Sequence, residues 1–451
     1  MPVLAQNWIS PETEDDVVIS PRYGHSAVID KARGRMILFG GVTGNEYSSE
    51  VFIYDLNYKF WRKVKPTGKI PPRYNHSAVM WGKKTMVVFG GHGMGGRLDD
   101  IWFLNTKNWS WVKISVQEDS QVPLARRHHI SFMHNDHLCI FGGWDNHLKD
   151  LGDMWMINLN ASPRVWFKVP FDDTWKQILI EHDLIKGRKV VQESEGEGED
   201  GDSEKKQYEE DEEEDFGYDF GEYEDEMSSK DLITPSSRRG HSALKYNNKI
   251  YVFGGIFMTK GHKNDLHSFN LNTFKWQLEK CNGKYPSARE GHTAVLNGDD
   301  MVVFGGTPKG KIKDTMATLN LKTMTWYTEN QMIWTNIPRI RCDHTMICHK
   351  QIFYMFGGEG EKLVVDSLEK DEDKKKIKEK WVGERLNDFY MSEILDDFRK
   401  KDAEQEDEEE ELKYEDNTFV TASKIPKKTA TFNKIGDGKT PHGYKVRLEK
   451  K

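Results

Sequence analysis

The stretch RYGHSAVIDKARGRMILFGG, residues 22–41, contains the pattern that decides the fold. It begins with an arginine, has a histidine three positions later, and ends with a phenylalanine followed by two glycines. Two short apolar runs lie between these markers and are separated by turn-forming residues, so the stretch predicts two β-strands. The same pattern returns along the chain, which makes this stretch one copy of a repeat.

Phe-Gly-Gly occurs six times, with steps of 50, 52, 112, 51 and 52 residues, so one repeat carries about 60 extra residues. The first glycines are Gly40, Gly90, Gly142, Gly254, Gly305 and Gly357. A histidine precedes each of them by 13 to 15 residues: His25, His76, His129, His241, His292 and His344. An arginine precedes each histidine by three: Arg22, Arg73, Arg126, Arg238, Arg289 and Arg341. Each repeat therefore predicts four strands joined by turns.

An acid and a tryptophan complete most copies of the repeat. The acids are Glu50, Asp100, Asp153, Asp265 and Asp314, and the sixth is delayed to Asp388. The tryptophans are Trp61, Trp111, Trp166, Trp276 and Trp326. The sixth copy has no such tryptophan, but Trp8 precedes Arg22 by 14 residues, close to the 12 that separate Trp61 from Arg73. We therefore expect the N-terminal strand to complete the last unit and close a ring.

A period near 50 with four strands and a diglycine resembles the kelch repeat, over roughly residues 7–394 without the insertions. The R-x-x-H-S/T variant is similar to the repeats of Tea-type polarity proteins, host cell factor and leucine-zipper-like regulators. The resemblance implies an all-β fold, a six-bladed kelch β-propeller closed by the N-terminal strand. A residue needed in every blade is structural, so we interpret the diglycines, the tryptophans and the Arg–acid series as packing and pairing residues.

The expected organisation has four parts. Residues 1–170 hold blades 1 to 3, and residues 235–394 hold blades 4 to 6 with a charged insertion at 359–386. Residues 171–234 form a long acidic insertion, largely disordered, and residues 395–451 a disordered C-terminal tail. Within the charged insertion, SLEKDEDKKKIKEKW at 367–381 is rich in helix formers and predicts a helix.

The net charge of −8 hides a segregation of charge. Residues 193–226 hold 19 acids against two lysines, a balance of about −17, and residues 402–416 contribute about −9. The remainder carries about +18, of which about +7 lies in the last 35 residues, so the folded part is mildly basic and the acidic segments are attached to it.

The resemblance implies that partners bind on the face where blades are joined and where the second and third strands of each blade connect. Positions there that vary between repeats are the candidate site: Tyr23, Tyr74, Asn75, His92, Arg127, His128, Trp144, Arg239, Glu290 and Asp343, with Arg97, Asn146 and Lys309 in the same loops. Two tyrosines and two arginines suit a binding hot spot, and arginines favour an acidic or carboxylate-bearing peptide. The alternative is that these residues only cap the central channel.

The acidic insertion offers a second candidate site. Aromatic side chains are interleaved with its acids and could anchor a basic protein: Tyr208, Phe216, Tyr218, Phe220 and Tyr223. The segment could instead be a solvated tether, or could screen the propeller face. This leaves open a chaperone-like binder of basic proteins that works through residues 192–227.

Other classes of function find little support in the sequence. His128, His129, His134, His137 and Cys139 lie within twelve residues, but neighbouring strand residues face opposite sides, so we expect no metal site there. No nucleophile motif is present, and the copper ligands of galactose oxidase, a kelch enzyme, cannot be matched. An enzyme with a metal- or sugar-binding channel remains the alternative from another class. We predict no catalysis, cofactor, nucleic acid or membrane span, and a cytoplasmic location, with the lysine-rich end a weak nuclear signal.

Overall fold

The computed structural model of this chain describes residues 6–10, 17–170, 234–308, 316–328, 334–371 and 374–394. All of them belong to one compact unit, Met1–Phe398. The acidic insertion, apart from its last residue, and the tail after 394 lie outside the described residues. Every regular element that is described is a β-strand, which confirms the all-β prediction. Within this part of the chain, no helix long and apolar enough to cross a membrane occurs.

Six antiparallel sheets with four main strands each dominate this unit, and we number them as blades 1 to 6; in blades 3, 5 and 6 a short fifth strand is added. Blade 1 consists of β3 (Ser26–Asp30), β4 (Arg35–Phe39), β7 (Val51–Asp55) and β8 (Trp61–Val64); blade 2 of β9 (Ser77–Trp81), β10 (Thr85–Gly93), β11 (Gly96–Asn105) and β12 (Ser110–Ile114); blade 3 of β14 (Ile130–His134), β15 (His137–Asp145), β16 (Asp150–Asn158) and β17 (Trp166–Val169). Blade 4 consists of β18 (Ser242–Tyr246), β19 (Lys249–Phe253), β22 (Leu266–Asn270) and β23 (Trp276–Leu278); blade 5 of β26 (Thr293–Asn297), β27 (Asp300–Phe304), β29 (Met316–Asn320) and β30 (Thr325–Thr328); blade 6 of β33 (Thr345–His349), β34 (Ile352–Phe356), β37 (Phe389–Ile394) and β1 (Gln6–Ile9).

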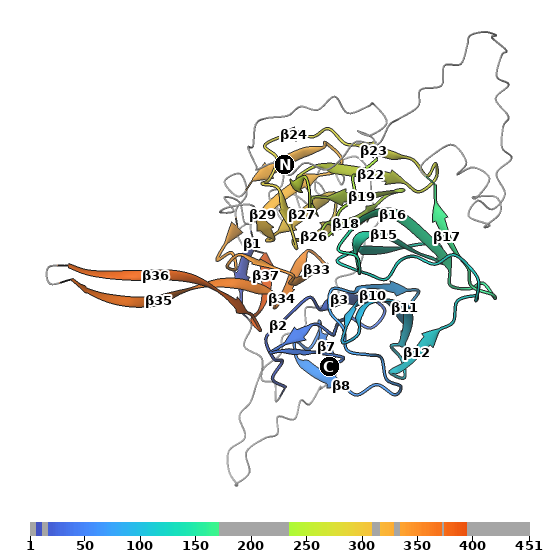
Figure 1. Cartoon of the computed structure of the whole chain (residues 1–451), viewed down its shortest axis with the longest axis horizontal. Coiled ribbons are helices and arrows are strands. Elements are labelled where there is room, and N and C mark those ends of the chain that lie inside the picture. Colours follow the sequence, from blue (N-terminus) through green and yellow to red (C-terminus); the bar gives the residue numbers. More distant parts are fainter. Residues whose placement is uncertain are drawn as a thin grey trace, which may run out of the picture. The chain divides into compact units, whose positions relative to one another are not determined.

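The first strand of each blade lies innermost, around a central axis (Figure 1). Each of these strands contacts the first strands of both neighbouring blades, and the contact between β33 and β3 completes the cycle. The last blade takes its outermost strand from the beginning of the chain, because β1 pairs antiparallel with β37 and places Trp8 opposite Ser392. The predicted closure by the N-terminal strand is confirmed.

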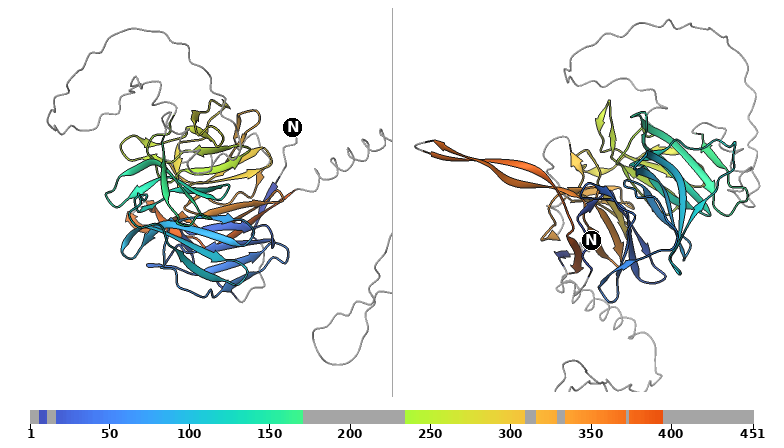
Figure 2. Two further views of the ribbon diagram at one scale, coloured as in Figure 1. Left: turned by 90° about the vertical axis from the view of Figure 1, so that its right-hand side faces the viewer. Right: turned by 60° about the horizontal axis from the view of Figure 1, so that its bottom comes forward.

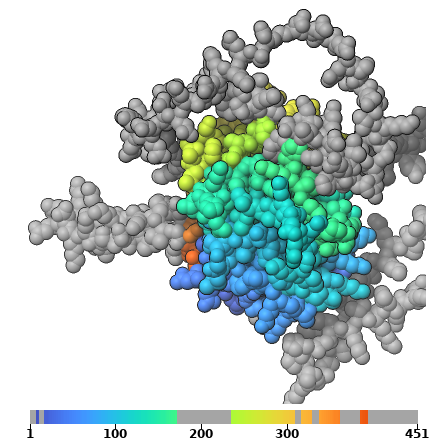
Figure 3. Space-filling view, turned by 45° about the vertical axis from the view of Figure 1, so that its right-hand side comes forward, coloured from blue at the N-terminus to red at the C-terminus, as the bar shows by residue number. Residues whose placement is uncertain are grey.

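Neighbouring blades are held together by hydrophobic packing. The buried apolar side chains form six clusters, and each cluster draws on two adjacent blades. Phe89 of blade 2, for example, contacts Trp166 of blade 3 with ring centroids 5.4 Å apart. The equivalent pairs are Phe39–Trp111, Phe141–Trp276, Phe253–Trp326, Phe304–Trp8 and Phe356–Trp61. Each such aromatic pair stabilises the interface by about 0.5–1.5 kcal/mol beyond the area it buries. Blades 1 to 4 accordingly form a continuous surface (Figure 3).

The repeat arginines are buried and tie their own blades together. Arg126 donates to the carbonyl oxygen of Gly142 at 3.0 Å and binds both carboxylate oxygens of Asp153, at 2.7 and 3.0 Å. The corresponding pairs are Arg22–Glu50, Arg73–Asp100, Arg238–Asp265 and Arg341–Asp388, so the delayed acid of the sixth repeat takes its expected place. Pairing satisfies a guanidinium that would otherwise be costly to bury.

The diglycines allow one blade to approach the next closely. Gly90 has a φ of +61°, and a Cβ atom there would lie 2.9 Å from the carbonyl oxygen of Arg126 in blade 3 and 3.0 Å from that of Leu98. No real Cβ atom tolerates two such contacts without movement of the backbone. The position therefore needs glycine both for its left-handed conformation and for the space between blades.

The charged insertion of blade 6 is a β-ribbon, so the helix predicted at 367–381 is wrong. β35 (Glu359–Asp371) pairs antiparallel with β36 (Lys374–Arg385) and leaves the propeller as a long hairpin (Figures 1 and 2). The register pairs Leu363 with Trp381 and Leu368 with Ile377. The error arose because lysine and glutamate favour helices in isolation, whereas the ribbon continues the hairpin between the second and third strands of its blade.

Candidate functional site

One face of the propeller carries both the connections between blades and the loops between second and third strands. In blade 3, β13 (Arg126–Arg127) pairs with β15, and Arg127 lies opposite Trp144. Similar short pairings occur in the other blades: β2 (Arg22–Tyr23) with β5 (Val42–Thr43), Tyr74 with His92, Arg239 with Ile256, β25 (Arg289–Glu290) with β28 (Thr307–Pro308), and β32 (Arg341–Cys342) with β35. We call this surface the mouth face.

A closed ring of backbone hydrogen bonds surrounds the axis at this face. The N–H of the residue before each repeat histidine donates to the carbonyl oxygen of its counterpart in the preceding blade, at 2.7–3.0 Å. The six residues are Gly24, Asn75, His128, Gly240, Gly291 and Asp343. All have left-handed φ angles between 50° and 65°. Glycine, asparagine and aspartate adopt this conformation more readily than other residues, which explains most of the sequence at these positions.

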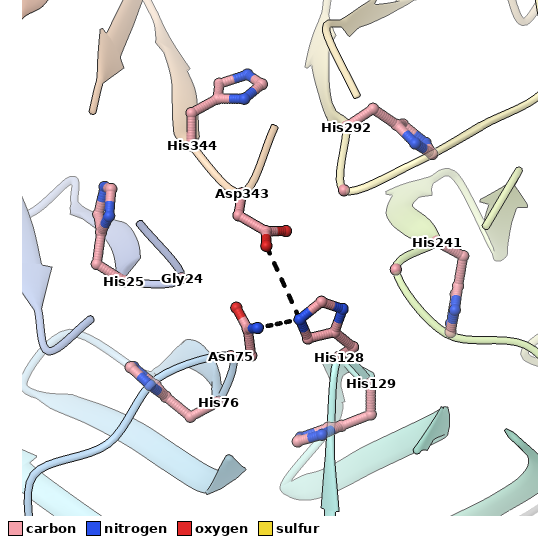
Figure 4. Close-up of a pocket in the computed structure, with 12 residues that line it drawn as sticks. Gly24, His25, Asn75, His76, His128, His129, His241, His292, Asp343 and His344 are labelled. Carbon is pink, nitrogen blue, oxygen red and sulfur yellow. Dashed lines mark hydrogen bonds and ion pairs between the residues drawn. The ribbon is translucent and has the colours of Figure 1, made fainter. Parts of the chain in front are cut away.

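Three side chains of this ring fill the centre of the channel. Asn75 contacts the Nε2 atom of His128, which lies 3.9 Å from the Asp343 carboxylate (Figure 4). Together with the repeat histidines they line a cavity of about 130 Å³. Burial, and then the charge of Arg127, lowers the pKa of His128 to about 3, while burial raises the pKa of Asp343 to about 6. These three predicted residues therefore cap the channel.

The repeat histidines link each blade to the next. In five of the six, the Nε2 atom shares a hydrogen bond of 2.8–2.9 Å with the hydroxyl that follows the histidine of the preceding blade. The pairs are Ser26–His76, Ser77–His129, Ser242–His292, Thr293–His344 and Thr345–His25. Blade 3 has Ile130 at the hydroxyl position, and His241 finds no hydrogen-bond partner among the described residues.

The most unusual feature of the mouth face is a cluster of three arginines on one tryptophan. The guanidinium carbons of Arg97, Arg127 and Arg239 lie 4.4, 4.7 and 4.5 Å from the ring centroid of Trp144. They come from blade 2, the start of blade 3 and the start of blade 4, respectively. We call these four residues the arginine platform. Each stacked guanidinium gains cation–π attraction, but the three positive charges repel one another.

The three arginines differ in how their charges are neutralised. Asp150, which is fully buried, accepts from Arg239 at 2.6 Å. The guanidinium of Arg97 donates to the side-chain carbonyl of Asn146, a neutral group, at 3.5 Å, and the backbone N–H of Arg97 donates to the same oxygen at 3.1 Å. Arg127 donates to the hydroxyl of Tyr74. Neither Arg97 nor Arg127 forms an ion pair in the described part of the chain. Burial, and then the charge of Arg127, lowers the pKa of Arg97, so an anion bound here would relieve real repulsion.

An aromatic cluster borders the platform. Tyr74 contacts Tyr23 edge-on at 6.1 Å, Tyr47 at 5.0 Å and His92 at 5.4 Å between ring centroids. Arg385, at the base of the β35–β36 ribbon, lies 5.2 Å above the ring of Tyr23. The cluster therefore connects the ribbon of blade 6 with the arginine platform of blades 2 to 4.

A carboxylate at the start of blade 5 borders the platform. Glu290 lies 3.9 Å from Arg239 and 3.5 Å from the Nε2 atom of His262. Burial raises the pKa of Glu290 to about 7, although the charge of Arg239 opposes this shift. We call Glu290 and the axial Asp343 the mouth carboxylates.

The structure thus divides the predicted residues into groups. Tyr23, Tyr74, His92, Arg127, Trp144 and Arg239 meet at the platform and its aromatic border; Asn75, His128 and Asp343 lie on the axis; Glu290 faces Arg239 from the start of blade 5. The insertion anchors Tyr208, Phe216, Tyr218, Phe220 and Tyr223, and the loop residue Lys309, lie outside the described residues. Sequence reasoning missed Asp150 and Tyr47, since neither belongs to a repeated position.

The suspected metal cluster in blade 3 does not come together. His129 bonds Ser77 towards the neighbouring blade, whereas His134 and His137 are opposite one another at the far end of the β14–β15 hairpin. Among the described residues, no group of three or more His, Cys, Asp and Glu side chains is arranged to hold a metal ion.

The model of the KLHDC2/KLHL20/DRC7 kelch-repeats domain matches residues 3–186 and 218–379, most of the chain. The chain belongs to the kelch-repeat family. This confirms the resemblance drawn from the diglycines and the R-x-x-H pattern, and with it the kelch β-propeller. Kelch repeats typically serve as protein-interaction scaffolds.

Several relatives are about 25% identical to this kelch protein over the aligned residues. A leucine-zipper-like transcriptional regulator 1 homolog of Drosophila melanogaster is 25% identical over 66% of this chain and 31% of its own length. Human host cell factor 2 is 25% identical over 80% of this chain and 42% of its own. Bovine kelch domain-containing protein 3 is 26% identical over 64% of this chain and 62% of its own length. The chain therefore spans less than two thirds of these relatives.

Proposed function

We propose that this kelch protein is an adaptor that binds a partner protein on its mouth face, through carboxylates that dock on the arginine platform. The observation that carries the proposal is the stacking of three guanidinium groups on Trp144, two of which, Arg97 and Arg127, have no ion pair among the described residues. Arginine presents a planar fork that matches a carboxylate, and a charge-assisted hydrogen bond stabilises a complex by about 1.5–3 kcal/mol.

The surroundings of the platform favour recognition of a macromolecule. The aromatic cluster of Tyr23, Tyr47 and Tyr74 supplies the residue type that dominates binding hot spots. Tyr74 and Asp150 hold the guanidinium groups of Arg127 and Arg239, and Asn146 accepts from that of Arg97 at 3.5 Å, so part of the side-chain entropy is lost before a partner binds. The positive field would also steer an acidic partner towards the face, an effect that salt weakens.

Two alternatives remain as proposals of lower rank. A chaperone-like binder of basic proteins would work through residues 192–227, which lie outside the described residues. An enzyme would need a site in the channel, where the axial side chains and repeat histidines leave only about 130 Å³. We favour the adaptor and, from composition alone, propose that it acts in the cytoplasm.

The test is affinity capture from the native source with four forms of the full chain. They are the intact protein, Arg97→Gln/Arg127→Gln, Lys83→Gln/Lys84→Gln and a deletion of 192–227. The lysine pair lies in the turn between β9 and β10, at the other end of the blade from the mouth face, and provides a matched change of charge.

We expect partners to be retained by the lysine variant and lost, at least tenfold, with the arginine variant. Retention by the arginine variant would refute binding at the platform. Loss with the deletion alone would move the function to the acidic insertion.

A further inference from the structure

Three exposed apolar side chains stand at the tips of the loops around the arginine platform. Met94, Leu148 and Met258 expose 87%, 56% and 55% of their surface. They lie in the loops between the second and third strands of blades 2, 3 and 4, the same blades that contribute the platform arginines. We call these three residues the apolar rim. Exposed apolar surface rimmed by polar residues is one mark of a protein-interaction site, and the loops that carry these side chains belong to the blades of the arginine platform.

The leucine of the rim is held in an unfavourable backbone conformation. Leu148 has a φ of +60°, a left-handed value that is costly for a non-glycine residue. Asp145 fixes the loop, because its carboxylate accepts the backbone N–H groups of His147 and Lys149, both at 2.9 Å. Strain of this kind persists where the surrounding structure imposes it, and it is concentrated at functional sites.

Met258 is placed by the same residue that holds the platform. Asp150 accepts the backbone N–H of Met258 at 2.6 Å and pairs with Arg239 at 2.6 Å. Met94 occupies the two-residue turn between Gly93 and Gly96, which pair across the β10–β11 hairpin. The backbone at Leu148 and Met258 is thus anchored beside the charged platform, and the two methionine side chains are adaptable.

We propose, on the basis of the proposed function, that the partner presents an internal Asp or Glu with apolar residues on both sides of it. The carboxylate docks on Arg97 and Arg127, and the flanking apolar side chains contact the rim. Because the rim residues come from three successive blades, a chain that crosses the platform meets an apolar tip before and after the acid. A free C-terminal carboxylate would leave one side of the rim without a contact.

Two peptide libraries test this inference on the full chain. In one, random twelve-residue segments lie within a display protein; in the other, the same segments end in a free carboxylate. Enriched peptides are then measured by fluorescence anisotropy against four proteins: the intact chain, Arg97→Gln/Arg127→Gln, the rim variant Met94→Gln/Leu148→Asn/Met258→Gln, and Val112→Thr. Asparagine suits the left-handed backbone at 148, so the rim variant keeps its fold. Val112 is an exposed apolar residue of β12, away from the rim, and serves as control.

We expect the internal library to yield an acid flanked by apolar residues. Its affinity should fall about tenfold or more with the rim variant, remain with Val112→Thr, and disappear with the arginine variant. If binding needs the arginines but ignores the rim, or if only free C-termini are enriched, the inference is overturned and the proposed function stands. Selected peptides that bind the arginine variant as tightly as the intact chain would overturn both.

Discussion

Replacement of Gly90 by alanine tests whether the diglycines set the distance between blades. Gly82, in the turn between β9 and β10 of the same blade, is a matched control, because its φ of +60° equals the +61° of Gly90 within a degree. A Cβ atom at Gly82 meets nothing within 4 Å, whereas one at Gly90 lies 2.9 and 3.0 Å from two carbonyl oxygens and 3.1 Å from the imidazole of His129. The two substitutions therefore share the conformational cost and differ in the steric one.

The expected loss in the free energy of unfolding follows from the conformational cost and the steric cost. A left-handed alanine costs about 1–2 kcal/mol, partly offset by the reduced entropy of the unfolded chain. Gly82→Ala should thus lower the free energy of unfolding by about 1 kcal/mol. Overpacking adds about 1–3 kcal/mol, so Gly90→Ala should cost about 2–4 kcal/mol. Urea unfolding followed by both fluorescence and circular dichroism measures the difference. Equal losses in the two variants would refute the steric argument.

Two further predictions concern the histidines. Burial, and then the adjacent arginine, lowers the pKa of the repeat histidines, to about 3 in His292. The unfolded chain takes up these protons near pH 6.5, so the stabilisation is complete above that pH. The free energy of unfolding should fall as the pH drops from there towards 3, by up to about 1.4 kcal/mol per pH unit for each histidine. The mouth carboxylates, whose pKa values are raised, oppose this trend between about pH 7 and 4.5, but they are fewer than the histidines. Thermal unfolding at pH 7.5 and 5.5 should therefore give the lower midpoint at pH 5.5. An unchanged midpoint would contradict the lowered pKa values of the repeat histidines. Ser242→Ala removes the hydrogen bond to His292 and should cost about 1–2 kcal/mol in urea unfolding, whereas no loss would mean that the bond does not hold the blades together.

Much of the fold could be predicted because its determinants repeat. Because arginine, histidine, diglycine and tryptophan recur in order, the strand pairing of one blade could be applied to every blade. Trp8 predicted the closing strand. The ribbon at Glu359–Arg385 could not be predicted in the same way. It occurs once, and its lysines and glutamates favour a helix locally, whereas the hairpin that leads into it imposes strand pairing.

The candidate site was predictable in location but not in composition. Variation between repeats pointed to Arg127, Trp144 and Arg239, and the structure brings them into contact. The same criterion also selected Asn75 and His128, which lie on the axis with left-handed backbones, because variation between repeats does not show where in the mouth a side chain lies. Separating the two groups required side-chain positions in three dimensions.

A charge swap tests the central claim, contact between the platform and a partner carboxylate, most directly. Arg127→Glu in this protein is combined with Asp/Glu→Lys in the captured partner segment, and the four dissociation constants are compared. We predict that each single change weakens binding at least tenfold and that the double change recovers a substantial part of the loss, because the opposite charges are again paired. If the two losses simply add, the arginine does not contact the carboxylate and the account is contradicted.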